Sequence, residues 1–388
     1  MLFRSGELFD YLARGKPKVV AYNVDFAEPD SRIGFKFGEA TLSGEESDAS
    51  MAKSMRDLGN VILLADATFN GEATVNPLPD YGYRFEGPGI TERKVVFSPF
   101  QRLAESAAGF GHNLFVLDPD GPIRHTVPFV RSGGRSLVSL GAAVVLKVAG
   151  IKPSDVRLDG SQLRIGDKVM PLAWRQVSTA GGNERYLWGL INFHGPALLE
   201  DMKHRTYPSY SFFDLLYSEE QILAGEKPDI DPSVFKDKMV FVGVTASGLF
   251  DVFETPFAHG KMPGIQIHAA AADDILTGRF MQTASTRVRM ATVVGAGLVV
   301  ALVAANVPAW WGAGATLGFV VLFGWGATRL FAGGYWLNMS QPIFASSFSL
   351  FGGVAYQYFV EGREKRKMKK LFGQYVSKDV YEQLVQHP

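Results

Sequence analysis

The sequence predicts a mixed α/β domain, with a mainly parallel sheet and a small β meander, followed by an all-α bundle of three membrane helices. Two observations lead to this fold class. Short apolar runs alternate with amphipathic segments through residues 1–286. Three long apolar segments then follow in close succession, at about residues 290–307, 309–331 and 342–360. At the rise of an α-helix, each can cross about 30 Å of hydrocarbon.

The first part of the chain predicts a parallel crossover unit. Residues 7–14 form an amphipathic helical pattern, and the apolar runs 18–23 and 61–65 are typical of buried strands. Between these runs, Asp48 or Ser50 can cap a second helix. Strand, helix and strand in this order predict two parallel neighbours in one sheet.

The middle of the chain predicts antiparallel structure. The turn residues 118–121 favour a β-hairpin, and Ser136 is expected to begin a helix. Three short runs between residues 156 and 172, separated by Asp-Gly and Gly-Asp, predict the meander. Residues 210–217 have the pattern of a helix.

The last part of the soluble region predicts a strand and a helix that complete the sheet. Residues 239–244 are β-branched and apolar, as in a central strand, and residues 264–276 form a helix that Gly278 ends. Ligands bind at the carboxyl edge of α/β sheets, so Asp25 and Asp251 are expected to face a shared crevice with His268 beside them. The alternative is that these side chains only stabilise loops and helices.

Catalytic and metal motifs are absent from the sequence. It has no cysteine and no His/Cys spacing typical of a metal site, so we assign no catalytic residue and no metal ligand. A hydrolytic enzyme using Asp25, Asp251 and His268 stays open as an alternative function. The 388 residues have a formal net charge of zero, which gives no indication of nucleic-acid binding.

Aromatic residues at the ends of the apolar segments favour membrane spans over core helices of a large soluble protein. Trp310 and Trp311 begin the second segment, and Tyr335 and Trp336 follow it. On one side of the membrane lie three cations, Arg287, Arg289 and Arg329. On the other side lie six, which also suit lipid headgroups: Arg363, Lys365, Arg366, Lys367, Lys369 and Lys370.

This distribution predicts the topology. The excess of cations places residues 361–388 in the cytoplasm, as a basic helical linker. Three spans then place residues 1–286 outside, in a multi-pass protein of the inner (plasma) membrane whose large domain is periplasmic or extracellular. Residues 1–18 contain no apolar run that could serve as a leader. We therefore expect an additional membrane anchor upstream in the reading frame.

Residues 235–280, "FKDKMVFVGVTASGLFDVFETPFAHGKMPGIQIHAAAADDILTGRF", resemble the C-terminal signature of the CHASE sensor domain of the second type. The segments "KVVAYNVDFAEPD" and "SDASMAKSMRDLGNVILLA" resemble its N-terminal part. The likeness covers about residues 5–282 and implies a sensor of an extracytoplasmic ligand or protein. It makes Thr255, in the family's Thr-Pro loop, a further ligand-binding candidate. The family's initial anchor helix and first strand are missing, which suggests an N-terminally truncated domain.

The C-terminal segment "KKLFGQYVSKDVYEQLV" resembles the linker that precedes class III adenylate or guanylate cyclase domains. Met368, Leu371, Phe372 and Tyr375 form one apolar stripe at helical spacing, suited to transmit a signal. The resemblance implies a homodimer and an output domain, absent here, that uses ATP or GTP with metal ions such as magnesium. This chain itself would hold no cofactor. A histidine or serine/threonine kinase output is the alternative.

Overall fold

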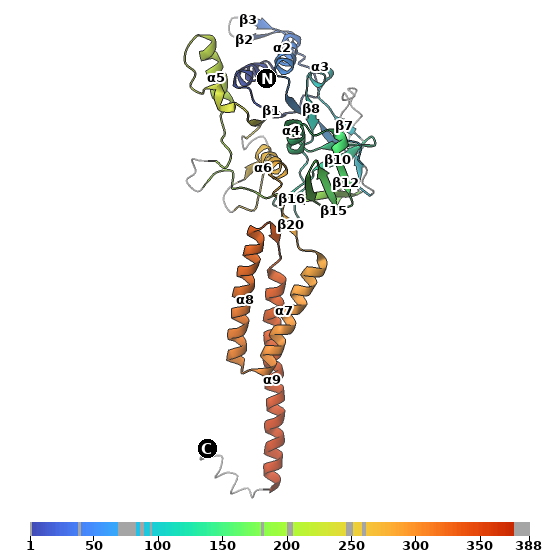
Figure 1. The fold of residues 1–388 in the computed structure, drawn as a ribbon, viewed down its shortest axis with the longest axis vertical. Coiled ribbons are helices and arrows are strands. Elements are labelled where there is room, and N and C mark those ends of the chain that lie inside the picture. The colour runs from blue at the N-terminus through green and yellow to red at the C-terminus, as the bar shows by residue number, and fades with distance from the viewer. Residues whose placement is uncertain are drawn as a thin grey trace. The chain divides into compact units, whose positions relative to one another are not determined.

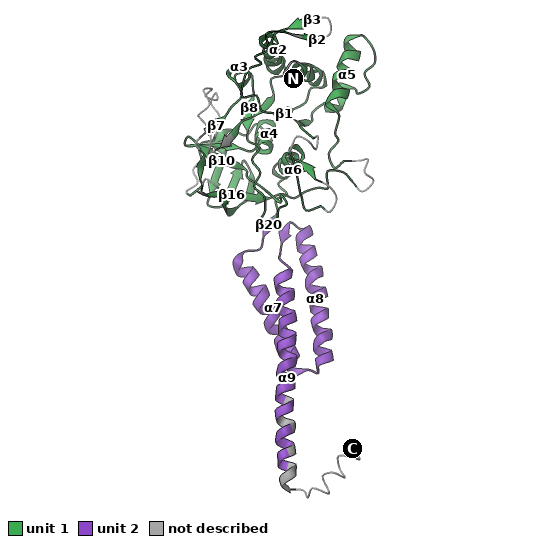
Figure 2. Cartoon of the chain, turned by 180° about the vertical axis from the view of Figure 1, so that it is seen from behind, with its two compact units in different colours: residues 1–281 green, residues 282–388 purple. Residues whose placement is uncertain are grey.

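The computed structural model describes residues 2–37, 40–68, 83–85, 89–93, 95–179, 182–199, 205–245, 251–257 and 261–375 (Figure 1). The chain packs into two compact units, Met1–Met281 and Gln282–Pro388 (Figure 2). The first, here called the soluble unit, is mixed α/β. The second, here called the helical unit, contains the three apolar helices. Both findings confirm the predicted fold class.

The helices are α1 (Leu2–Gly15), α2 (Gly44–Leu58), α3 (Gln101–Ala104), α4 (Leu140–Ala149), α5 (Phe212–Leu223), α6 (Gly264–Thr277), α7 (Thr286–Asn306), α8 (Ala309–Ala332) and α9 (Ser340–Tyr375), with the short 3-10 helices η1 (Pro153–Asp155) and η2 (Pro232–Phe235). The strands are β1 (Val19–Asn23), β2 (Phe35–Phe37), β3 (Ala40–Leu42), β4 (Val61–Leu64), β5 (Asp66–Thr68), β6 (Glu92–Arg93), β7 (Val95–Phe97), β8 (Gly109–Gly111), β9 (His125–Thr126), β10 (Phe129–Ser132), β11 (Arg135–Val138), β12 (Val156–Asp159), β13 (Gln162–Ile165), β14 (Lys168–Pro171), β15 (Ala173–Thr179), β16 (Gly182–Leu190), β17 (Met239–Gly243), β18 (Val252–Phe253), β19 (Met262–Pro263), β20 (Gln282–Thr283) and β21 (Tyr335–Trp336).

A four-stranded parallel sheet in the order β17-β1-β4-β8 forms the centre of the soluble unit. Helices cover both of its faces. Val19 and Ala21 of β1 pack with α4 and α6 on one face, whereas Val20 and Tyr22 pack with α1 and α2 on the other. Successive strand residues point to opposite faces, so a strand buried on both sides is apolar throughout. This explains why the run 18–23 could be recognised as a buried strand.

Strand β17 lies at the edge of this sheet, where the sequence predicted a central strand. Its sequence is nevertheless apolar on both faces. Met239 and Phe241 pack against the core beside α4 and α6, and Val240 and Val242 pack against the core beside α1. Helices that extend to the edge strand therefore produce the same pattern as a central position.

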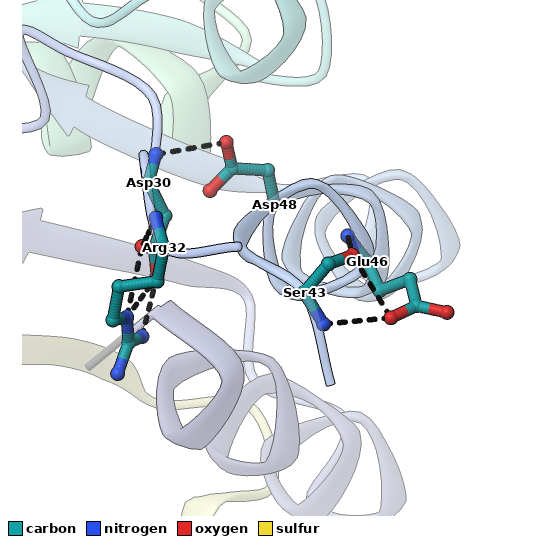
Figure 3. Close-up of polar contacts among 5 residues, drawn as sticks. All are labelled: Asp30, Arg32, Ser43, Glu46 and Asp48. Carbon is teal, nitrogen blue, oxygen red and sulfur yellow. Dashed lines mark hydrogen bonds and ion pairs between the residues drawn. The ribbon is translucent and has the colours of Figure 1, made fainter. Parts of the chain in front are cut away.

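Helix α2 begins earlier than predicted, because Ser43 and not Asp48 or Ser50 is its N-cap. Ser43 and Glu46 form a capping box: the Glu46 N–H donates to Ser43 Oγ at 3.2 Å, and the Ser43 N–H donates to Glu46 Oε2 at 2.7 Å (Figure 3). Asp48 instead lies within the first turns of the helix and accepts the backbone N–H of Asp30 at 3.1 Å (Figure 3). It fixes the loop that precedes α2.

Two predictions in the middle of the chain are wrong. Asp118 and Gly121 form a turn through the Gly121 N–H, but the segment before the turn is not a strand, and β9 pairs with β16 instead. Ser136 lies in β11, and α4 starts after Ser139, whose hydroxyl caps it. The last three residues of β11 are all buried, so this run could not be distinguished from the start of the apolar helix that follows it. The meander of β12, β13 and β14 was predicted correctly.

The helical unit extends the first and third predicted spans. Helix α7 begins at Thr286 because Ser285 accepts the N–H of Val288, and it ends at Asn306. Helix α9 begins at Ser340, whose N–H donates to the Asn338 side chain. It continues without a break through Tyr375, beyond the residue 360 at which the apolar segment ends. Small residues let α9 and α7 pack closely. A Cβ on Gly353 of α9 would lie only 2.5 Å from the Cβ of Ala304 of α7, so the contact requires a glycine.

Candidate functional site

The carboxyl ends of β1 and β17 meet the N-terminus of α6, and this edge of the sheet carries the polar residues that the sequence selected. Asn23 ends β1 and Gly243 ends β17. The contact between β17 and α6 is close, because a Cβ on Gly243 would lie 2.8 Å from the Cβ of Ile265. Only a glycine lets the strand end and the helix start approach this far.

Asp251 occupies this edge beside the first residue of α6. The Nδ2 of Asn23 donates to Asp251 Oδ2 at 3.2 Å, and the N–H of Gly264 donates to the Asp251 carbonyl at 3.0 Å. A Cβ on Gly264 would lie 2.4 Å from Asp251 Oδ1, so the carboxyl group rests directly on the helix start. Partial burial raises the pKa of Asp251 to about 6. This carboxyl group therefore titrates close to neutral pH.

His268 lies one turn into α6 and is fully buried. Its ring packs against Phe115 with 4.5 Å between the ring centres, and neither ring nitrogen has a hydrogen-bond partner. Burial lowers the pKa of His268 to about 3, so the imidazole is neutral at physiological pH. A neutral histidine without polar partners neither orients nor activates a nucleophile in this arrangement.

The structure adds His112, a buried residue that follows β8 at the same edge. Its Nδ1 accepts the N–H of Leu114 at 3.1 Å, which assigns the ring proton to Nε2, and Nε2 has no partner. Burial holds the pKa of His112 well below its usual value. Asn23 Oδ1 and Gln266 Oε1 are likewise buried without a partner. Unsatisfied polar atoms thus concentrate at this edge of the sheet.

The remaining sequence candidates, Asp25 and Thr255, form no hydrogen bond with this group among the described residues. Asp25 is exposed. Thr255 is buried. Among the described residues no hydrogen bond joins Asp25, Asp251 and His268 to one another, so the structure does not assemble the hydrolytic arrangement. The assignment of Asp25, Asp251, Thr255 and His268 to ligand binding stays a prediction.

A second polar cluster, which sequence reasoning missed, lies at the C-terminal end of α6. Asp274 is buried, and its Oδ2 accepts the backbone N–H of Asn192 at 2.7 Å. Asp273 contacts His194, with 3.0 Å between its Oδ2 and the histidine Nε2. Two aspartates near the C-terminal end of a helix oppose the helix dipole, and this unusual placement was the signal available in the sequence.

A hollow in the surface of the soluble unit lies elsewhere. It measures about 1090 Å³ and lies beside the free edge of β8, where Ile62, Phe85, Phe110, Leu146 and Leu158 contribute apolar walls. None of the candidate site residues lines it. In the part of the chain that the structure describes, no group of three or more His, Asp or Glu side chains is arranged to hold a metal ion.

The three long helices have the length and composition of membrane spans: Thr286–Asn306, Ala309–Ala332 and Ser340–Val360. Large apolar side chains cover their outer faces, among them Leu302, Leu322 and Phe348, which are 66, 69 and 73 % exposed. Such faces are stable in lipid and not in water. These helices indicate a membrane protein.

Comparison with known proteins gives one match. The model of the CHASE2 domain family matches residues 4–306, which is more than half of the chain and ends at the last residue of α7. No curated protein and no solved structure matches the chain.

Proposed function

The chain belongs to the CHASE2 domain family, and from this premise we propose that it is the sensory and transmembrane region of a receptor-type nucleotide cyclase. A CHASE2 sensor domain with three apolar helices indicates a receptor for extracytoplasmic signals. The proposal adds the output: a class III catalytic domain after residue 388 that makes a cyclic nucleotide from ATP or GTP with magnesium. The resemblance of residues 369–385 to the cyclase linker supports this output.

The continuity of α9 is the observation that carries the proposal. The apolar span ends at Val360, and the same helix runs on through Tyr375. At 1.5 Å per residue this extension is about 20 Å long. A rotation or shift of the span therefore reaches the end of the helix without an intervening loop.

The extension has two different faces. Arg363, Arg366, Lys367 and Lys370 are exposed, and Met368 and Leu371 are 59 and 56 % exposed. For Lys365, Lys369, Phe372 and Tyr375 the structure describes the helical backbone but not the side chains. Exposed apolar side chains on a helix that leaves the membrane are expected to pack against the same helix of a second copy. A homodimer suits a class III cyclase, whose active sites form between two catalytic domains.

The orientation is also part of the proposal. Cations flank the third span on its C-terminal side, which favours a cytoplasmic extension and an extracytoplasmic soluble unit. Reporters fused after Tyr375 test this orientation. A fluorescent protein that folds only in the cytoplasm should be active there, and a phosphatase that folds only outside should be inactive. The reverse pattern contradicts the proposed topology.

Helical phase provides the functional test. The chain is fused to a class III cyclase domain, and alanines are inserted after Lys370. Insertion of two alanines rotates the output domain by about 200° around the helix axis. Insertion of seven rotates it by about 700°, which is about 20° short of two full turns and nearly restores the original orientation. We expect cyclic nucleotide production to change with two residues and to be restored with seven. Equal production in the two variants and the parent would contradict transmission through α9.

The alternative is a kinase output on the same sensor, since a continuous helix can serve either enzyme. The full reading frame after residue 388 separates the two. A Gly-rich kinase loop there would refute the cyclase assignment and leave the sensory role intact.

A further inference from the structure

The last residues of the soluble unit are held at the end of β16. The chain leaves α6 at Gly278, and residues 279–281 lead to Gln282, where the helical unit begins. Met281 forms an antiparallel bridge with Leu190, the last residue of β16. Asn192 Nδ2 donates to the carbonyl of Arg279 at 3.2 Å. These two contacts hold the exit segment, residues 279–281, at the end of the strand.

The same asparagine also binds a buried carboxyl group. The backbone N–H of Asn192 donates to Asp274 Oδ2 at 2.7 Å. Asp274 is 2 % exposed, and its Oδ1 has no hydrogen-bond partner. Asn192 therefore connects the end of α6 to the exit segment, and any change at Asp274 acts on the residue that holds Arg279.

The charges around Asp274 do not neutralise it. Asp273 is adjacent on the same helix turn, and His194 Nε2 lies 3.0 Å from Asp273 Oδ2 but 3.7 Å from Asp274 Oδ1. Arg279 Nη2 lies 3.9 Å from Asp273 Oδ2 and 3.3 Å from the histidine Nε2.

Two further groups face this end of α6. The hydroxyl of Tyr207 is buried without a hydrogen-bond partner, and Lys168 of β14 extends beside Gly278. Burial raises the pKa of Asp274 to about 8 and outweighs the hydrogen bond from the Asn192 N–H, which lowers it; the charge of Asp273 raises this pKa further and that of Arg279 lowers it. The carboxyl group is therefore mainly protonated at neutral pH.

We propose that Asn192, Asp274 and the exit segment form a proton-sensitive clasp that holds the chain where it leaves the soluble unit. With Asp274 neutral, the clasp is closed. Ionisation leaves a buried carboxylate oxygen without a donor and next to Asp273, and opening toward water relieves this cost. Opening displaces Asn192 and releases Arg279, which frees the segment that leads into the first membrane helix. With the topology proposed above, protons outside the membrane are therefore an input to this receptor, whichever output domain follows.

Amide hydrogen exchange of the full chain in detergent tests the clasp. Protection factors, corrected for the intrinsic exchange rate at each pH, are measured for residues 279–283 at pH 6 and pH 9. In the wild-type chain we expect protection to fall at least tenfold at pH 9. Residues of β13 serve as the internal control and should keep their protection. Equal protection of residues 279–283 at both pH values overturns the proposal.

Two variants identify the titrating group. Asp274→Asn keeps the shape and removes ionisation, so residues 279–283 should lose their pH response. His194→Gln keeps a polar side chain without titration near neutral pH, and here the pH response should persist. The opposite pattern overturns the assignment to Asp274. Asn192→Ala provides a third measurement, because it should lower protection at both pH values through loss of the bond to Arg279.

Discussion

The two units of this protein differ in whether their buried polar side chains have hydrogen-bond partners. In the helical unit, Thr316, Ser346 and Ser347 each donate their hydroxyl to the carbonyl four residues earlier in the same helix. In the soluble unit, both nitrogens of His268 and one oxygen of Asp274 are buried without a partner. Lipid offers no hydrogen bonds, so a span must satisfy its polar groups internally. A water-exposed domain can retain unsatisfied groups that open toward solvent or receive a ligand.

The units also share one packing device. A glycine lets two helices cross closely in each: Gly141 of α4 meets the carbonyl of His268, and Gly353 of α9 meets Ala304 of α7. In the soluble unit the crossing lies within a larger apolar core. In the helical unit the surrounding lipid is itself apolar, so close contact between small residues supplies most of the association. The same substitution is therefore expected to have different consequences in the two units.

The largest predicted effect concerns Asp274. Its folded pKa of about 8 exceeds its usual value of 3.8, so the stability it contributes is complete below pH 4 and is lost as the pH rises to 8. At about 1.4 kcal/mol per pKa unit, this loss is several kcal/mol. Denaturant unfolding of the full chain in detergent, at pH 5, 6.5 and 8, should show this slope.

The Asp274→Asn variant provides the matched comparison, because other titrating groups are unchanged in it. The difference in unfolding free energy between the variant and the wild type should grow with pH. Parallel pH profiles for the two proteins would show that Asp274 is ionised in the folded state, and the contrast with the helical unit would weaken.

The next prediction addresses the membrane crossing. Gly353→Leu inserts a side chain where even a Cβ would lie 2.5 Å from Ala304, so α9 and α7 must separate. We expect a loss of about 3 kcal/mol or more. Gly352→Leu is the control, because nothing lies within 4 Å of its Cβ position. Thermal stability of the detergent-solubilised chain should fall for the first variant alone, and equal effects at both positions would contradict the crossing.

A smaller effect is expected at the corresponding crossing in the soluble unit. In Gly141→Ala the new Cβ would lie 2.5 Å from the His268 carbonyl, and overpacking of this kind costs about 1–3 kcal/mol. Gly6→Ala in α1 is the matched helical control, because its nearest neighbours lie at 3.4 Å. Helix propensity should make that variant neutral or up to about 1 kcal/mol more stable. Urea midpoints of the two variants decide between these outcomes.

The smallest predicted effect separates the two buried histidines. His268→Phe removes nitrogens that have no partners, so stability should change by less than about 1 kcal/mol. His112→Phe leaves the N–H of Leu114 without its acceptor, and we expect a cost of about 1–3 kcal/mol. Thermal unfolding measures both. A large loss in His268→Phe would show that its nitrogens do have a stabilising role in the fold.

Sequence patterns identified the elements that depend on burial periodicity. The runs that became β1 and β4, the helix α6 and the three apolar helices were all predicted, because each has one periodicity and one environment along its length. Predictions failed where neighbouring residues offer competing signals. Asp48, Ser50 and Ser136 are good caps by type, but Ser43 and Ser139 occupy the positions from which a side chain reaches the first free N–H groups.

For the candidate sites, too, some features could be predicted from the sequence and others could not. The sequence alone placed Asp251 and His268 near the carboxyl edge of the sheet, because topology brings strand ends together. Only the tertiary structure paired Asn23 with Asp251, buried His112 nearby, and placed Asn192 between Asp274 and Arg279. Those contacts join residues that are far apart along the chain. A periodic pattern reports which face of an element is buried, whereas the identity of a long-range partner is fixed only when the layers pack.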